Sequence, residues 1–176
     1  MNTSKKKLSK KNKLNQSNLS NIYLPSLLNT KILLNINNIG SNFKEILKEK
    51  MINTLTGKCI EEGYLKSDSI EIINYSAGIV KENNIEFNVT YECLLCNPCE
   101  GMVIDCKVEN ITLAGIKAKL YDDTLENPII IFVARDHNYL SEKFSNINVE
   151  DKITIRIVGS TFEINDKHIY VIGNII

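Results

Sequence analysis

Four cysteines near the middle of the chain have the type and spacing that most directly suggest chemistry. Cys93, Cys96 and Cys99 recur every three residues in the run CLLCNPC, and Cys106 lies nearby. Four thiolates could hold a zinc ion, but a zinc ribbon joins two cysteine pairs across a long spacer. This run instead occupies a predicted strand and its exit, where alternation turns Cys93 and Cys96 to opposite faces. We therefore expect buried thiols, with no metal and no cofactor.

The carboxylates and histidines do not form a catalytic pattern. Asp122-Asp123 follows a predicted strand, as in metal-assisted phosphoryl chemistry, but no second cluster of carboxylates or histidines accompanies it. His137 lies in a polar Arg-Asp-His-Asn group and His168 near a predicted turn, and neither has a triad partner. The sequence also lacks a GxxxxGKS-type phosphate loop and a Gly-x-Ser-x-Gly elbow. We expect a protein that is not itself a catalyst.

Charge is distributed unevenly along the 176 residues. The 21 Lys and Arg residues equal the 21 Asp and Glu residues, yet residues 1–13 hold six lysines and no acid. The remainder is therefore net acidic and unsuited to strong, indiscriminate phosphate binding. No apolar run approaches the roughly 20 residues of a membrane helix, and no signal-peptide core follows the lysines. Five cysteines, an odd count, then indicate reduced thiols inside a cell.

Residues 1–21 are rich in Lys, Asn and Ser and have no sustained apolar period. Such a segment buries too little surface to offset its ordering entropy, so we expect a disordered basic tail. Its functional interpretations are an arm on nucleic acid or a nuclear targeting signal. The structural alternative is a solvated terminus.

Residues 22–97 are predicted to form a small α+β domain. Residues 28–36 alternate as a strand does, with Ile32, Leu34 and Ile36 on one side. A helix over residues 42–55 follows, and three extended segments come next, at residues 58–61, 69–80 and 85–95. The helix is expected to cover the apolar face of the sheet.

The helix over residues 42–55 has clear boundaries. Asn42 precedes Glu45 by three residues, a plausible capped start, and Gly57 can adopt the left-handed conformation that ends a helix. Its apolar stripe recurs every four residues, at Phe43, Leu47, Met51 and Leu55, with Ile46 beside it. The following run KCIEEGYLK turns at Gly63-Tyr64, which we expect to present an aromatic ring.

Residues 98–176 are predicted to form an all-β barrel, since Pro98 marks a boundary that a central strand could not cross. Five strand candidates follow, at residues 102–112, 115–121, 128–134, 152–162 and 169–175. A polar segment, residues 136–145, separates the third from the fourth, and the last pair turns at Asn165-Asp166. Five strands with a short helix after the third is the order of an OB-fold.

In this order, the segments resemble the stalk subunit of multisubunit RNA polymerases, the seventh-subunit family of RNA polymerase II with archaeal relatives. The resemblance rests on IGSNFKEILKEKMINTLTGKCIEEGYLK, on the junction YECLLCNPCEGMVIDCKVENITLAGIKAKL and on the closing pair KITIRIVG and IYVIGNI. It covers residues 22–176 and implies a truncated RNP-like tip domain followed by the OB-fold. The segment NPIIIFVARDHNYL looks most like stalk subunits of giant DNA viruses, so we expect a viral protein.

The resemblance implies a non-catalytic subunit that docks on the polymerase core through Gly63 and Tyr64 of the tip. The implied partners are the largest subunits and the clamp-base subunit, and a fourth-subunit-like stalk partner is left open. The implied location is the virion and the viral factory in the host cytoplasm, with the nucleus as the alternative. The barrel would contact emerging single-stranded RNA weakly. Candidate RNA contacts are Lys107, Lys117, Lys119, Tyr121, Arg135 and His137.

Two alternatives remain open. An acidic body makes a merely solvated barrel face as reasonable as an RNA-binding one. A free-standing OB-fold RNA-binding module in translation or RNA decay is the second function, and it would need no tip domain. The segment from Phe43 to Tyr64 therefore separates the two functions, because only the polymerase subunit requires it.

Overall fold

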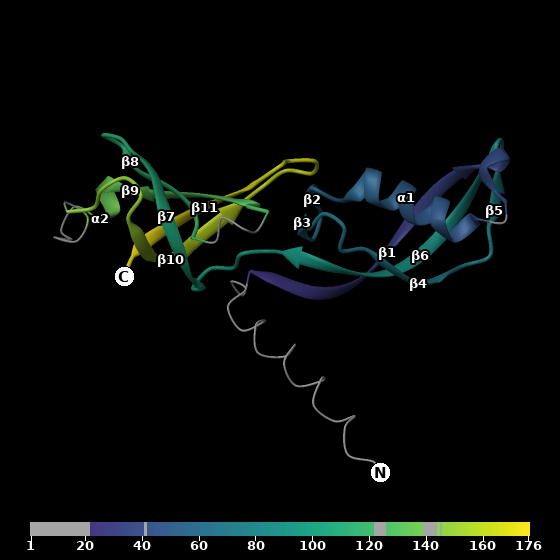
Figure 1. Cartoon of the computed structure of the whole chain (residues 1–176), viewed down its shortest axis with the longest axis horizontal. Helices are drawn as coiled ribbons and strands as arrows, with labels where there is room; N and C mark the ends of the chain where they lie inside the picture. Colours follow the sequence, from purple (N-terminus) through teal and green to yellow (C-terminus); the bar gives the residue numbers. More distant parts are fainter. Residues whose placement is uncertain (1–21, 41, 122–125, 139–143, 145) are drawn as a thin grey trace, which may run out of the picture.

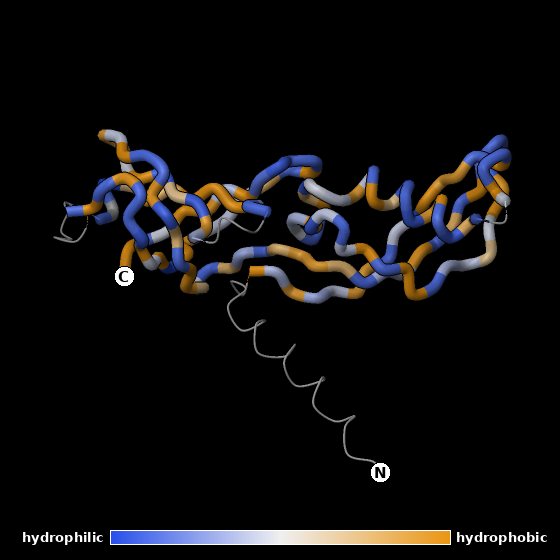
Figure 2. Tube along the Cα trace, viewed as in Figure 1, coloured by the Kyte–Doolittle hydropathy of each residue, from blue (hydrophilic) through white to orange (hydrophobic). Residues whose placement is uncertain are grey.

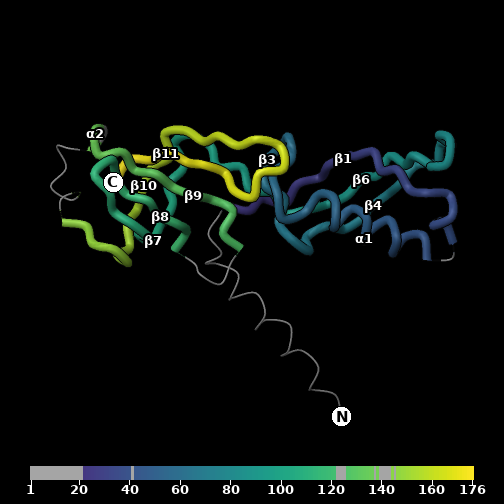
Figure 3. Tube along the Cα trace, turned by 90° about the horizontal axis from the view of Figure 1, so that it is seen from above, coloured from purple at the N-terminus to yellow at the C-terminus, as the bar shows by residue number. Residues whose placement is uncertain are grey.

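The structure is a computed structural model that describes residues 22–176 except 41, 122–125, 139–143 and 145. The molecule is elongated, mostly β, with a helix-covered sheet at one end and a closed barrel at the other (Figure 1). The same arrangement is visible from above in Figure 3. We refer to these parts as the N-terminal sheet and the barrel. No helix among the described residues is long and apolar enough to span a bilayer.

The two longest strands of the N-terminal sheet pair with each other. β1 (Tyr23–Asn35) and β6 (Asn84–Cys96) pair antiparallel over their whole length. β1 begins five residues before the predicted strand, because its first residues pair with the end of β6. The predicted strand extends one residue too far, to Ile36. Ile36 begins a 3-10 turn, η1 (Ile36–Asn38), that leaves the sheet at Asn35, whose Oδ1 accepts a hydrogen bond from the Asn37 amide at 3.0 Å.

Shorter strands line the other side of β6. β3 (Gly63–Leu65), β4 (Glu71–Tyr75) and β5 (Ile79–Lys81) pair with it in turn, and β2 (Lys58–Ile60) pairs with β3. The predicted strand over residues 69–80 is thus two strands. β4 ends at Tyr75 and β5 begins at Ile79, and within β4 the register with β6 shifts between Ile72 and Asn74. β3 was not predicted as a separate strand.

The helix α1 (Phe43–Leu55) packs on one face of this sheet, as predicted. Leu47 and Met51 are fully buried, and the other stripe residues are partly buried against the strands. Asn42 is the N-cap residue, but its side chain does not make the capping hydrogen bond. Gly57 has a φ of +71° just after the helix, which confirms the predicted left-handed stop.

The barrel contains the five predicted strands. They are β7 (Val103–Ile111), β8 (Gly115–Leu120), β9 (Ile129–Ala134), β10 (Lys152–Thr161) and β11 (Ile169–Ile175). A short helix, α2 (Arg135–Asn138), follows β9. The closed order β10-β11-β9-β8-β7, with β9 and β11 parallel, is consistent with an OB-like barrel. The RNP-like character of the N-terminal sheet and the domain boundary at residues 97/98 stay predictions.

Apolar side chains form two cores, and alternation of hydropathy along the strands is visible in Figure 2. One core lies between α1 and the sheet. The other fills the barrel and continues into the N-terminal sheet, where its members are Ile22, Cys59, Tyr64 and Cys96. The sheet and barrel therefore share buried apolar contacts where they meet.

Candidate functional site

The predicted docking residues lie where the N-terminal sheet meets the barrel. Tyr64 is on β3, opposite Cys59 of β2 and Cys96 of β6. Its side chain is only 3% exposed and belongs to the apolar core that fills the barrel. The expectation of a projecting aromatic ring is therefore wrong, because the barrel covers the ring. Contact of Gly63 and Tyr64 with a polymerase core stays a prediction.

Gly63, the residue before Tyr64, allows β3 to lie close to the end of β6. Its φ is +136°, a conformation that residues with a side chain rarely adopt. A Cβ at this position would also lie 2.5 Å from the Cys96 carbonyl oxygen. The glycine thus lets β3 approach the end of β6, which carries the neighbouring Tyr64 into the interface with the barrel.

A carboxylate from the barrel receives the hydrogen bonds of this interface. The Tyr64 hydroxyl donates to Glu126 Oε1. Ser67 donates twice, from its amide to Oε2 at 3.0 Å and from its hydroxyl to Oε1 at 2.9 Å. Tyr23 donates to the Glu126 carbonyl oxygen at 3.1 Å. Glu126, on the segment between β8 and β9, thereby joins the barrel to β1 and to the β3–β4 connection.

The electrostatics at Glu126 favour the charged form. Burial alone would raise its pKa, but the hydrogen bonds from Tyr64 and Ser67 outweigh burial, and the nearby Lys66 adds to them. The net result is a Glu126 pKa below its usual range. Burial, followed by the bond to Glu126, raises the pKa of the Tyr64 hydroxyl, which therefore stays a proton donor. The pair is a charge-assisted hydrogen bond in a partly buried setting.

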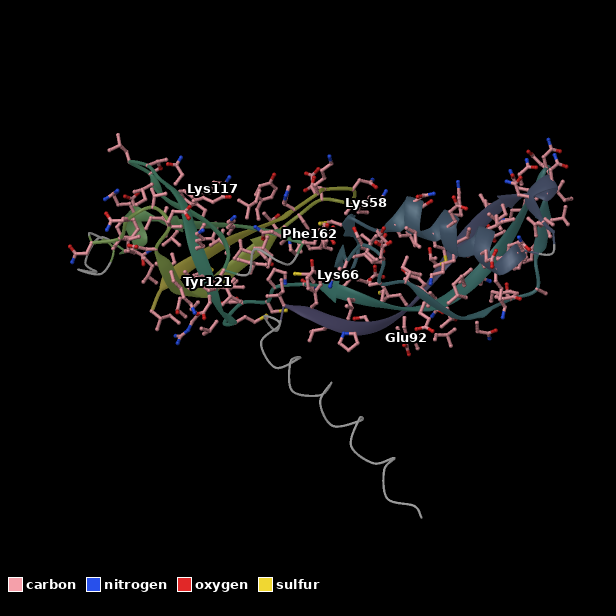
Figure 4. The ribbon with its side chains drawn as sticks, in the orientation of Figure 1. Lys58, Lys66, Glu92, Lys117, Tyr121 and Phe162 are labelled. Carbon is pink, nitrogen blue, oxygen red and sulfur yellow. The ribbon has the colours of Figure 1, made fainter. Side chains whose placement is uncertain are left out.

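A second connection comes from the hairpin between β10 and β11. The Cys59 amide donates to the Asp166 carbonyl oxygen at 2.7 Å, and the Asn165 amide donates to the Cys59 carbonyl oxygen at 2.8 Å. Lys58 Nζ donates to Asn165 Oδ1 at 2.7 Å. Figure 4 shows Lys58 at the barrel-facing end of the sheet, near the hairpin that carries Phe162. The predicted turn at Asn165-Asp166 therefore also braces the sheet.

Sequence reasoning missed Glu126 and Ser67 as parts of this interface. Neither residue stands in a motif, and their partners are about sixty positions away in the chain. The predicted turn at Asn165-Asp166 was the one available signal, since a tight polar turn between long strands can reach a neighbouring element.

Three of the four cysteines, Cys93, Cys96 and Cys106, are buried as predicted. Cys93 is buried beneath α1, whereas Cys96 and Cys106 are buried in the barrel core, so Cys93 and Cys96 do point to different sides. Burial raises the pKa of both Cys96 and Cys106 to about 12, which keeps these thiols protonated. Cys99 is exposed, contrary to expectation, because it lies in the turn after β6. Within the described residues, no three His, Cys, Asp or Glu side chains form a metal-binding group.

The predicted RNA-contact lysines lie on β7 and β8. Lys107 Nζ is 2.5 Å from Glu150 Oε2, and Lys117 Nζ is 2.9 Å from Glu109 Oε2. Lys119 lies directly opposite Lys107 in the β7–β8 register. Acidic neighbours therefore balance part of the charge that a phosphate would meet, which favours weak binding at most.

The other three candidates are separated from one another. Tyr121, visible in Figure 4, is 51% exposed, with Lys152 Nζ 4.5 Å from its ring centre. The Arg135 guanidinium donates to the carbonyl oxygens of Leu113 and Thr112 at 2.9 and 3.1 Å, so it braces the β7–β8 loop. His137 lies in α2, and its side chain, like Asp122-Asp123, is outside the described residues. RNA contact by any of them stays a prediction.

The outer face of the barrel carries aromatic side chains that sequence reasoning missed. Phe132 on β9 pairs with Ile172 on β11, and Tyr170 lies two residues before Ile172 on the same face. All three are exposed, and Lys117 lies across from Phe132. Alternation could have identified them, because Ile129, Ile131 and Val133 point inward.

The fold, together with the contacts of Tyr64 and Glu126, defines the class of protein: a helix-covered sheet is fixed to an OB-like barrel. No protein-family model matches the chain. The chain is similar to a protein of Acanthamoeba polyphaga mimivirus named "Putative DNA-directed RNA polymerase subunit". The two are 27% identical over an alignment of 172 residues, and the alignment covers 88% of this chain and 82% of that protein. A match of that extent must include both the sheet and the barrel.

Proposed function

We propose that the chain is a non-catalytic stalk subunit of a DNA-directed RNA polymerase, of the kind that giant DNA viruses carry. The observation that carries the proposal is the similarity to the mimivirus protein across 88% of the chain. The sheet-plus-barrel layout supports it, since the implied stalk subunit joins a tip domain to an OB-fold. On this proposal the protein acts in the virion and viral factory, or in the nucleus if transcription takes place there.

The N-terminal sheet would be the tip that docks on the core, against the largest subunits and the clamp-base subunit. The β2–β3 hairpin offers Glu61 and Glu62 at its exposed turn, while Gly63 and Tyr64 fix the hairpin from beneath. We therefore assign the core contact to this hairpin, with Gly63 and Tyr64 acting by holding its shape. Tighter binding to one clamp state would bias the clamp towards that state.

The barrel would lie beside emerging RNA and contact it weakly. Lys117 and Lys119 supply charge on β8, and Phe132 and Tyr170 add exposed rings on which bases could stack. Tyr121, exposed after β8, is a further stacking candidate. The net acidic body and the ion pair of Lys117 limit the number of phosphates that can be neutralised.

Purification through a tag on this chain, from the native source, tests the proposal. The largest polymerase subunits are expected to co-purify in amounts equal to that of this chain and to stay bound at moderate salt. Recovery with ribosomes or an RNA-decay complex instead would favour the free-standing RNA-binding module. A variant lacking residues 43–64 would not be informative here, because it would remove α1, whose Leu47 and Met51 are buried in the core of the N-terminal sheet.

A further inference from the structure

The outer edge of β1 is free in the part of the chain that the structure describes. β1 pairs along all 13 residues with β6, and no other described strand pairs with it. The opposite side of β6 is covered in turn by β3, β4 and β5. A long free edge presents a row of unpaired backbone groups, and proteins normally cover or blunt such an edge.

Pro25 shows which backbone groups face outward. In an antiparallel ladder, alternate residues direct both their N–H and C=O towards one neighbour or the other. Proline lacks the N–H and is tolerated where that group would point away from the partner strand. Pro25 opposes Leu94 without a break in register, so Leu27, Asn29, Lys31 and Leu33 also direct their backbone groups outward.

The side chains of these four residues lie on the sheet face that α1 does not cover. Leu27 is 60% and Leu33 is 49% exposed. Asn29 Oδ1 accepts a hydrogen bond from the Thr90 hydroxyl at 2.6 Å, so this oxygen already has a partner within the sheet. Lys31 lies between the two leucine positions and carries a positive charge at the edge.

We propose that β1 binds an extended segment of a partner polypeptide, which adds as an antiparallel strand beside Leu27 to Leu33. Only another strand offers donors and acceptors at the spacing of these groups. The segment would place apolar side chains opposite Leu27 and Leu33, a small polar one opposite Asn29 and an acidic one opposite Lys31. The inference stands apart from the proposed function, because it follows from the edge alone.

A second copy of this chain fits the edge less well. Antiparallel pairing of two β1 strands about Thr30 would match Leu27 with Leu33, but it would also bring both Lys31 side chains into diagonal contact. Lysine and proline on an edge act against such self-pairing. An acidic residue from a different polypeptide removes this repulsion.

Amide hydrogen exchange tests the proposal on the full chain. In the isolated protein, the amides of Leu27, Asn29, Lys31 and Leu33 should exchange at least tenfold faster than those of Leu28, Thr30 and Ile32. In complexes purified from the native source, the faster group should become protected by tenfold or more, whatever the partner is.

Equal exchange of residues 27–33 in the free chain and in the complexes overturns the proposal. So does edge protection in the isolated monomer that disappears on removal of residues 1–20, or protection that accompanies dimerisation in ultracentrifugation.

A synthetic peptide provides the matched mutational test. The probe is a nine-residue strand with Ile, Glu, Thr and Ile at successive alternate positions. The double variant Leu27→Lys/Leu33→Lys should bind it at least tenfold more weakly than the unaltered chain. The control Ile79→Lys/Val80→Lys changes two exposed apolar residues on β5, across the sheet, and should bind normally. Equal loss in both variants, or no binding to the unaltered chain, contradicts the proposal.

Discussion

The Tyr64 hydroxyl of the N-terminal sheet donates a hydrogen bond to the Glu126 carboxylate of the barrel, 62 positions further along the chain. The bond lies beside the apolar core that the two parts share, and the β10–β11 hairpin adds backbone hydrogen bonds to Cys59. The orientation of the barrel relative to the sheet therefore depends on a few identifiable contacts. In a stalk subunit, that orientation would set where the barrel lies once the sheet is docked.

Tyr64→Ala should destabilise the isolated protein by about 3 kcal/mol, because it empties a buried site and removes the donor to Glu126. Tyr64→Phe keeps the ring and should cost about 1.5 kcal/mol. Urea unfolding of both variants measures the difference. A fully stable alanine variant would contradict the burial of Tyr64. Assembly assays on Tyr64→Ala therefore need this stability control before any loss is assigned to docking.

Glu126→Gln should lessen the loss of stability in acid. The folded-state pKa of Glu126 lies below its ordinary value of 4.5. Its contribution is therefore present above the unfolded pKa and is lost as the pH falls through the folded pKa. The free energy of unfolding, measured between pH 6 and about pH 3, should fall less steeply in Glu126→Gln than in the unaltered chain. Glu49→Gln, at an exposed position of α1, is the control. Identical slopes of unfolding free energy against pH in all three proteins would rule out the charged Glu126 bond.

Much of the fold follows from local patterns. Alternation located β1, β6 and the barrel strands, and the four-residue repeat located α1, because these signals need only neighbouring residues. The split between β4 and β5 was missed, since the residues at which a segment stops and resumes pairing depend on the partner strand β6. The end of β1 at Asn35 was missed for a similar reason, because the 3-10 turn that begins at Ile36 interrupts the alternation.

The candidate site was much harder to predict. Gly63 and Tyr64 drew attention through their types, but only the barrel, which packs from elsewhere in the chain, decides that the ring is buried. Arg135 was predicted to face RNA, whereas its guanidinium bonds to the loop before β8. Glu126 stands in no motif, so no sequence signal identified it.

Removal of residues 1–20 should shift the thermal midpoint by no more than about 2 °C. A polar, lysine-rich segment offers few apolar groups to bury, and surface ion pairs contribute little. Calorimetry of the full chain and the shortened chain gives the comparison. A drop of many degrees would mean that this segment packs on the folded body.

RNA binding should be weak, tolerant of sequence and reduced by salt. Each neutralised phosphate contributes about one unit of log affinity per unit of log salt, so a few contacts give a shallow slope. Lys117→Glu/Lys119→Glu should abolish crosslinking to single-stranded RNA without affecting assembly. Lys44→Glu/Lys48→Glu on α1 is the matched control and should crosslink normally. Arg135 is left unchanged in this test because of its bonds to the β7–β8 loop.

The salt dependence of RNA affinity distinguishes the two functional hypotheses for the barrel. A stalk subunit with few basic contacts should give the shallow slope described above. Tight binding to one RNA sequence that persists at high salt would favour a free-standing RNA-binding module.

The central claim is membership of a DNA-directed RNA polymerase, and quantitative mass spectrometry of the native enzyme tests it most directly. The polymerase would be purified from the native source through its largest subunit, without a tag on this chain. We predict that this chain is present at close to one copy per largest subunit and stays bound through size-exclusion chromatography. An active polymerase that lacks this chain, while the chain is abundant in the same extract, would contradict the account.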